Sequence, residues 1–263
     1  MLWGSKGVTK VSCDEEFNKA FEDVEDATRY SQTNTCIIEN FIQRRGFQID
    51  GDGFISDGKI AFFGVMDQHH NMERNPYAPI GLSYPSIQEE KYRKDAQSQI
   101  QLIFDKLGML FGGFNFEYII GEDDRVHILE VGPRNGGNLI PDTVQYACGV
   151  DMISASICAC VGDEYKKFLK PTHEGVASSY VIHSMTSGTF SGIRYHDGIE
   201  KQVVYKAIFK REGEQVNSFH VGLDCLGGMV IRFDNVSQMN DEMSRILSLI
   251  HISEPTRLRR ISY

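Results

Sequence analysis

Two glutamates interrupt two neighbouring apolar segments, and their spacing limits how this part of the chain can fold. Glu117 lies in Gly113–Ile120 and Glu130 lies in Arg125–Val131, with an acidic turn sequence, GEDD, between the segments. Alternating apolar residues on both sides of a turn predict an antiparallel hairpin. If the turn centres on its two aspartates, the two glutamates are directly opposite each other and share one face of the sheet.

Adjacent carboxylates repel each other unless a cation lies between them. Mg²⁺ prefers oxygen ligands and is commonly held by one or two carboxylates together with substrate phosphates. The pair Glu117 and Glu130 is therefore a candidate metal site. The alternative is that one glutamate faces water while the other forms a salt bridge.

The sequence GPRNGGN follows the second glutamate directly. Its glycines allow the backbone to approach a ligand closely. Arg134 offers a planar fork of donors that suits phosphate or carboxylate, and Asn138 lies four residues further on. An ordinary glycine-rich turn is the alternative interpretation.

Two further segments carry candidate binding residues. Gly4, Ser5, Lys6 and Gly7 form a short glycine loop whose backbone amides could face a phosphate, although such loops are common. Thr35–Ile42 is predicted to be a strand in which Glu39 is a lone acid. Its carboxylate could accept a hydrogen bond from an adenine amino group, or it could simply face water.

The remaining pattern alternates helices and strands and predicts an α+β protein. The long segment Asp67–Pro85 has three prolines and no period, so it is expected to be a loop, with His69 and His70 facing solvent or a substrate. From Gly175 onward short strands dominate, which predicts a second, β-rich unit. The other expected elements are helices over 14–29, 89–107 and 237–246, with Gly108 ending the second, and two helices between 139 and 161. Strands are expected over 47–54 and 59–65, joined in a hairpin by Asp57-Gly58, and the β-rich unit is expected to include short strands over 189–193 and 220–223.

Composition excludes several classes of protein. The chain is 41% hydrophobic and 24% charged, which is ordinary for a globular protein, and its formal net charge of −9 argues against broad nucleic-acid binding. It has no run of 18 apolar residues, so no membrane partner is expected. Six scattered cysteines without C-x-x-C spacing favour free thiols and a cytoplasmic location.

The ordered set GSKGV, IIENFI, FQIDGDGFISDGKIAFF, FNFE and LEVGPRNGGN resembles the ATP-grasp superfamily, nearest to its carboxylate–amine ligase and biotin-carboxylase-like branch. The resemblance covers about residues 4–161. It implies a fold with a small lobe, a large lobe with an antiparallel sheet and helices, and a small β-rich domain after them. The boundaries it implies are 1–43 for a remnant of the small lobe, 44–170 for the large lobe and 175–246 for the β-rich domain.

The resemblance also implies a function and a role for each candidate. The expected enzyme uses ATP and Mg²⁺, or Mn²⁺, to activate a small carboxylate as an acyl-phosphate that an amine then attacks; an oligomer is compatible with this. Gly4–Gly7 would close over the phosphates, and Glu39, Asn40, Phe41 and Ile42 would hold adenine. Glu117 and Glu130 would bind the metal, and Arg134 would steady the acyl-phosphate, with Asn138 and Gln48 nearby.

Three departures from the family pattern stand out. Gly132 occupies a position where the family often has asparagine, and Gln48 one where it often has an acid. The family's nucleotide-binding lysine normally precedes the glycine loop, so the chain is expected to be truncated at its amino terminus. A biotin-carboxylase-like enzyme and a nucleotide-binding fragment without turnover are the alternative functions.

The carboxyl terminus has a different origin on this interpretation. The sequence LSLIHISEPTR, from Leu247 to Arg257, resembles a translated sequencing adapter. Residues 247–263 are therefore expected to be a non-native tail, with a native amphipathic tail as the alternative.

Overall fold

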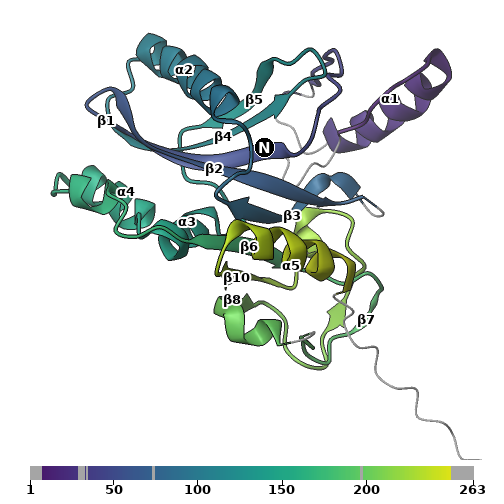
Figure 1. Ribbon diagram of the computed structural model, residues 1–263. Helices are drawn as coiled ribbons and strands as arrows, with labels where there is room; N and C mark the ends of the chain where they lie inside the picture. The colour runs from purple at the N-terminus through teal and green to yellow at the C-terminus, as the bar shows by residue number, and fades with distance from the viewer. Residues whose placement is uncertain (1–7, 29–32, 34, 73–74, 196–197, 250–263) are drawn as a thin grey trace, which may run out of the picture.

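The computed structural model describes residues 8–28, 33, 35–72, 75–195 and 198–249. These residues form one eight-stranded sheet in the order β5-β4-β1-β2-β3-β6-β10-β8, together with a separate two-stranded sheet, β7-β9 (Figure 1). The α-helices are α1 (Asp14–Thr28), α2 (Glu90–Leu107), α3 (Ile140–Cys148), α4 (Met152–Val161) and α5 (Val236–Leu249). The strands are β1 (Gln48–Ser56), β2 (Lys59–Asn71), β3 (Asn75–Tyr84), β4 (Gly112–Ile120), β5 (Val126–Gly132), β6 (Val176–Ile182), β7 (Gly188–Thr189), β8 (Val203–Ile208), β9 (Gln215–Val216) and β10 (Gly227–Phe233). An α+β fold is thus confirmed.

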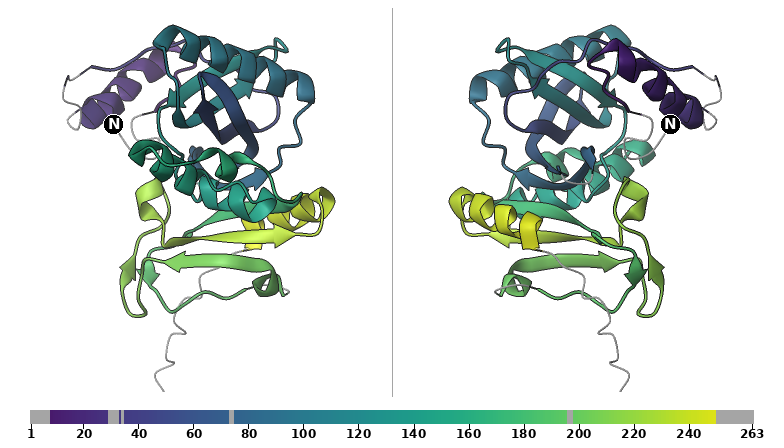
Figure 2. Two further views of the ribbon diagram at one scale, coloured as in Figure 1. Left: turned by 90° about the vertical axis from the view of Figure 1, so that its left-hand side faces the viewer. Right: turned by 90° about the vertical axis from the view of Figure 1, so that its right-hand side faces the viewer.

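Helix α2 shows how local sequence determines an element here. Its buried residues recur every four positions, which places them on one face: Tyr92, Ala96, Ile100 and Phe104. The helix ends at Gly108, which adopts the left-handed conformation at φ 65° and donates its N–H to the carbonyl of Phe104. The predicted helix and its glycine stop are both confirmed. Helix α1, also predicted, projects away from the sheet (Figure 2).

The expected loop over residues 67–85 is wrong. The structure continues β2 to Asn71 and then forms β3, so most of this segment belongs to the sheet. Its prolines were the misleading signal, because proline is rare in sheet interiors. Pro79 lies opposite His70 where the β2–β3 register shifts, and irregular positions of this kind tolerate proline.

The expected strand over residues 35–42 is also wrong. These residues are outside any helix or strand, and Ile37 and Ile38 are 85% and 77% exposed. A strand needs hydrogen-bonding partners for its backbone, and within the part of the chain that the structure describes, pairing begins after this segment, where Arg44 bridges Gly121. The apolar pattern alone therefore did not decide the conformation.

The expectation of a following, small β-rich domain is not confirmed. Strand β6 pairs antiparallel with β3, from Gly81 opposite Tyr180 to Tyr84 opposite Ala177, so β6, β10 and β8 continue the large sheet. Two expected strands also differ: residues 220–223 include the 3₁₀ turn Gly222–Asp224, and β7 stops at Thr189. The expected closing helix is present as α5, which extends to Leu249.

The helices cover both faces of the sheet. On one face, α2 packs against the aromatic residues Phe114, Phe116 and Tyr118 of β4. On the other face, α3 and α4 pack with Phe54, Phe62, Met66 and Leu82. Helix α5 covers β6 and β10 on the α2 side through Met239 and Met243. The strand residues that alternate with those under α2 therefore face the side of α3 and α4.

Among the described residues, no single helix is long and apolar enough to cross a membrane; α3 and α4 pass that test only as a pair, by length and composition, and are bent by 109° at their junction.

Candidate active site

The two glutamates are direct neighbours across β4 and β5. Glu117 pairs with Glu130 in the antiparallel ladder, as the spacing of the hairpin predicts. Directly paired residues project from the same face, so the two carboxylates lie side by side. This face is the one opposite α2, because the α2 side is occupied by the residues that alternate with Glu117, Phe116 and Tyr118.

The turn between these strands is centred on Asp123, and not between Asp123 and Asp124 as expected. Ile120 pairs with Val126, which puts Asp123 at the centre. The register then shifts between Glu117 and Tyr118, so that Leu129 is an extra residue on β5. This irregularity restores the pairing of the glutamates that the earlier turn would otherwise have displaced.

A third acid continues the row onto β1. Asp50 pairs with Glu117 from the other side and is only 4% exposed. Burial, and then the charge of Glu117, raises the pKa of Asp50 well above its usual range. Burial and the neighbouring Glu130 likewise raise the pKa of Glu117, opposed by a hydrogen bond from Gln48. The site thus concentrates negative charge that only a cation or a proton can neutralise.

Gln48 contacts one member of the glutamate pair directly. Its Nε2 donates to Oε2 of Glu117 at 2.7 Å. The residue was expected near the nucleotide, and the structure places it beside the central carboxylate of the row. An amide donor at this position stabilises the ionised form of Glu117, which is the form that binds a metal.

Asp52 holds the loop that follows Glu130. Its Oδ1 accepts the backbone N–H of Gly136 at 2.8 Å, and its Oδ2 accepts Nδ2 of Asn135 at 3.1 Å. Asn135 in turn accepts a hydrogen bond from Ser156 of α4 at 3.1 Å. Burial raises the pKa of Asp52 to about 6, against the lowering effect of these hydrogen bonds and of Arg134.

The loop carries Arg134 to the same side as the acids. Arg134 is exposed, and its Nη1 donates to the carbonyl of Asn135 at 2.9 Å. Its positive charge lowers the pKa of both Asp52 and Glu117, which places the guanidinium within electrostatic reach of both. Asn138 is exposed at the end of the loop, in the left-handed conformation at φ 51°.

Among the described residues, no hydrogen bond or ion pair joins the other expected binding residues to these acids. Glu39, Asn40 and Phe41 are exposed, and Ile42 is half-buried. Lys10 lies over the ring of Phe41, with Nζ 4.2 Å from its centroid. The expected phosphate loop, Gly4–Gly7, lies outside the described residues.

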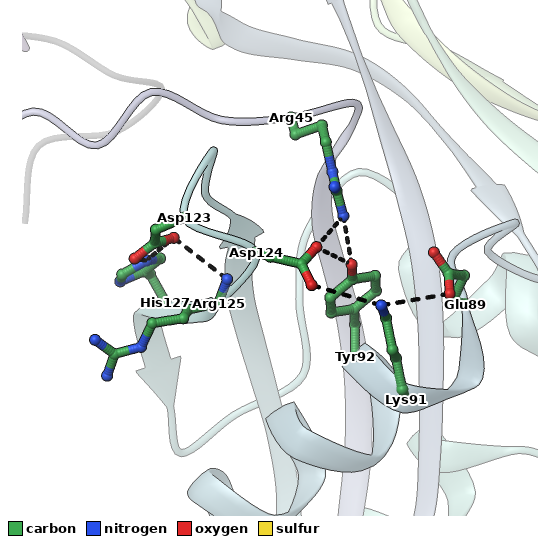
Figure 3. Close-up of polar contacts among 8 residues, drawn as sticks. All are labelled: Arg45, Glu89, Lys91, Tyr92, Asp123, Asp124, Arg125 and His127. Carbon is green, nitrogen blue, oxygen red and sulfur yellow. Dashed lines mark hydrogen bonds and ion pairs between the residues drawn. The ribbon is translucent and has the colours of Figure 1, made fainter.

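The segment after the expected adenine site is attached to the β4–β5 turn. The N–H of Arg45 donates to Ile120 at 2.7 Å, and the N–H of Glu122 donates to Gln43 at 3.0 Å. The side chain of Arg45 also reaches Oδ1 of Asp124 at 2.6 Å and the hydroxyl of Tyr92, which itself donates to Asp124 (Figure 3). The segment is thus tied to the hairpin that carries both glutamates.

His69 and His70 do not face solvent as expected of a loop. His69 is buried on β2, where its Nε2 lies 2.7 Å from the hydroxyl of Ser83. Burial lowers the pKa of each histidine to about 4. Neutral imidazoles inside the sheet are therefore part of its packing.

The donor set fits a hard divalent cation bound together with phosphate. Among the described residues, no group of three or more His, Cys, Asp or Glu is arranged to hold a metal alone. Mg²⁺ does not need such a cage, because it keeps waters and shares its coordination with substrate phosphates. Two side-by-side carboxylates, Glu117 and Glu130, with a nearby guanidinium match that mode of binding.

Sequence comparison agrees with this geometry. A model of the ATP-grasp domain matches residues 1–142, which is more than half of the chain. The chain belongs to the ATP-grasp family. A comparison with curated protein sequences gave no match.

Solved structures with the ATP-grasp fold cover nearly the whole chain. L-amino acid ligase from Bacillus licheniformis has a TM-score of 0.73 at 18% identity, over 95% of this chain and 62% of its own. Phosphoribosylglycinamide synthetase from Anaerococcus prevotii has a TM-score of 0.70 at 19% identity, over 92% and 61%. The biotin carboxylase domain of 2-oxoglutarate carboxylase from Hydrogenobacter thermophilus has a TM-score of 0.69 at 15% identity, over 95% and 55%. The chain thus spans about three fifths of the ATP-grasp structures it matches.

Three polar residues of the site carry no signal in the sequence that marks them as such: Asp50, Asp52 and Asn115. Asp50 and Asp52 alternate with apolar or glycine residues in the predicted strand 47–54, and residues two apart on a strand project from the same face. Their proximity to Glu117 depends on the pairing of β1 with β4, which are more than fifty residues apart. No hairpin rule predicts that pairing.

Proposed function

We propose that this chain carries the metal- and nucleotide-binding part of an ATP- and Mg²⁺-dependent ligase that joins a carboxylate to an amine. The direct pairing of Glu117 with Glu130 supports this proposal most strongly. The ATP-grasp neighbours include two enzymes named as a ligase and a synthetase, and one structure that holds MgADP and bicarbonate.

In the proposed chemistry, a carboxylate oxygen of the substrate attacks the γ-phosphorus of ATP and ADP leaves. The product of that step is an acyl-phosphate. An amine then attacks its carbonyl carbon, inorganic phosphate leaves with the bonding pair, and the amine loses a proton to give an amide.

The protein residues act mainly by placing charge. Glu117 and Glu130 would hold the divalent ion, which neutralises phosphate charge when bound. Gln48 orients Glu117 and favours its ionised form, against the effects of burial and of Glu130. Arg134 would pair with the phosphate or carboxylate oxygens, because its planar fork matches both. Asp52 fixes the loop on which Arg134 lies.

Nucleotide binding is the first test. Isothermal titration of the whole chain with ADP should show binding that needs Mg²⁺ and is lost in Glu117→Gln and Glu130→Gln. Mn²⁺ replacing Mg²⁺ should preserve it, because both ions accept carboxylate and phosphate oxygens. Equal binding with and without a divalent ion, or in both variants, would contradict the proposed site.

Turnover is the second test. ADP release would be screened against amino acids and bicarbonate, with hydroxylamine present to trap an acyl-phosphate as a hydroxamate. A hydroxamate formed with an amino acid supports the carboxylate–amine ligase. ADP release with bicarbonate alone would favour the biotin-carboxylase-like alternative. Binding without any turnover would leave the chain as a nucleotide-binding fragment.

A further inference from the structure

The metal pair lacks one oxygen donor that is common in the ATP-grasp family, because Gly132 stands where asparagine is often found two residues after the second glutamate. The inference that follows rests on the proposed function, since it concerns a ligand of the same metal. Gly132 has room for a side chain: a Cβ built there would meet only Oε1 of Glu130, at 3.9 Å. The site is thus open where the usual donor would lie.

A carboxamide is present directly across the ladder. Asn115 on β4 pairs with Gly132 on β5, in the same ladder as Glu117 and Glu130 and two residues away from them. Residues two apart on a strand project from the same face, so Asn115, Glu117 and Glu130 share one side of the sheet. Asn115 is 5% exposed, so its position is well defined by its neighbours.

The orientation of this carboxamide is set by its nitrogen. Nδ2 of Asn115 donates toward β1, with Oδ1 of Asp50 at 2.8 Å, the carbonyl of Gly51 at 2.9 Å and Oδ1 of Asp52 at 3.1 Å. All these partners are acceptors, so the nitrogen and not the oxygen must face them. No donor among the described residues reaches Oδ1, which is left as the free acceptor of the side chain.

We infer that Asn115 supplies the third protein oxygen for the divalent ion, in place of the asparagine missing at position 132. A neutral carbonyl oxygen suits a hard cation and adds no charge to a row that already contains Asp50, Glu117 and Glu130. The hydrogen bonds of Nδ2 to Asp50 and Asp52 hold the ligand in place, as the outer partners of metal ligands commonly do.

The test separates the oxygen of Asn115 from its nitrogen. Mn²⁺ binding is measured by electron paramagnetic resonance on the whole chain, without nucleotide and with ADP, and the melting temperature is recorded for each variant. Asn115→Ala removes both atoms, so it should weaken Mn²⁺ binding by on the order of 10-fold or more, as losses around metal sites commonly do, and lower the melting temperature.

A second variant restores the oxygen alone. Asn115→Ala with Gly132→Asn regains a carboxamide oxygen beside the metal pair but cannot restore the bonds from Nδ2 to β1. It should recover most of the Mn²⁺ affinity while its melting temperature stays low. Asn115→Asp, which keeps side-chain oxygens and lacks the donor, should likewise bind Mn²⁺ and melt early.

Two results would overturn the inference: Mn²⁺ affinity unchanged in Asn115→Ala, or affinity lost there and not recovered by Gly132→Asn. The nucleotide-free titration keeps this outcome apart from the ligase proposal. Mn²⁺ binding that depends on Asn115 in a chain that binds no nucleotide would refute the proposed function and support the ligand. Intact nucleotide binding with Mn²⁺ affinity independent of Asn115 would support the proposed function and refute Asn115 as a ligand.

Discussion

Asp52 on β1 accepts the backbone N–H of Gly136, eighty-four residues later in the chain, at 2.8 Å. This single carboxyl group also accepts hydrogen bonds from Asn115 and Asn135, so it joins two strands to the loop that carries Arg134. Asp52, together with the hydrogen bond from Ser156 of α4 to Asn135, therefore holds the loop in place relative to Glu117.

Replacing Asp52 with alanine should destabilise the protein by about 1–3 kcal/mol, because buried donors would be left without an acceptor. Asp52→Asn should cost less, since its carbonyl oxygen can still accept the N–H of Gly136. Urea unfolding of both variants measures the difference. An alanine variant as stable as the asparagine variant would show that these hydrogen bonds do not hold the loop.

The buried His69 should make the protein sensitive to acid. Its pKa is lowered from 6.5 to about 4, so the unfolded chain binds a proton that the folded chain refuses between these values. Stability is present above pH 6.5 and is lost as pH falls toward 4, by roughly 3 kcal/mol in total for this group. His69→Gln should flatten the unfolding free energy over that window.

A matched control for this prediction is His173→Gln, which replaces an exposed histidine. A change in the pH profile that appears in His69→Gln and not in this control is due to the buried position of His69. Asp52 contributes with the opposite sign: its pKa is raised from 3.8 to about 6, so its contribution to stability is present below pH 3.8 and lost as pH rises through 6. The two effects overlap, and only the difference between each variant and wild type isolates one of them.

Glu117→Gln should raise the melting temperature of the metal-free protein and abolish its response to Mg²⁺ and ADP. The pKa of Glu117 is raised by burial and by Glu130, which means that the ionised form is unfavourable in the free protein. Wild-type protein should gain stability when the ion and nucleotide bind the folded state. Thermal scans without and with MgADP measure the melting temperature of the metal-free protein and its response to the ligand. If the melting temperature of the variant rises with MgADP as that of the wild type does, Glu117 is not a metal ligand.

Arg45→Gln should increase amide hydrogen exchange over residues 43–46 while leaving α2 protected. Arg45 joins the segment before β1 to Asp124 and Tyr92, and the backbone bonds to Ile120 and Glu122 alone would then hold it (Figure 3). Arg93→Gln is the matched control, because Arg93 lies on the same helix as Tyr92 and its ion pair among the described residues is within that helix, with Glu90 at 3.8 Å. Equal amide exchange over residues 43–46 in the two variants would show that the side chain of Arg45 does not hold this segment.

Local signals predicted the parts of the fold that depend on neighbouring residues. The period of α2, its stop at Gly108 and the pairing of Glu117 with Glu130 all follow from short stretches of sequence. The β1–β2 hairpin was likewise predicted from Asp57-Gly58, whose φ angles of 53° and 73° fit the tight turn.

The sequence-based predictions failed where the conformation of a segment depends on strand pairing with residues distant in the sequence. Pro79 was taken as a sign of a loop, yet it sits at an irregular point of a strand held between β2 and β6. The run from Thr35 to Ile42 has strand-forming residues but pairs with no described strand, so it stays irregular. The acids Asp50 and Asp52 became part of the site only through the pairing of β1 with β4.

Because β6 pairs with β3, the last third of the chain covers an edge of the sheet that would otherwise be exposed. Without β6, the backbone groups of Gly81–Tyr84 that now face it would form an open border able to recruit a strand from another molecule. A protein ended at Lys170 is therefore expected to self-associate, even though the acids of the site lie on β1, β4 and β5, beyond β2 from the exposed edge.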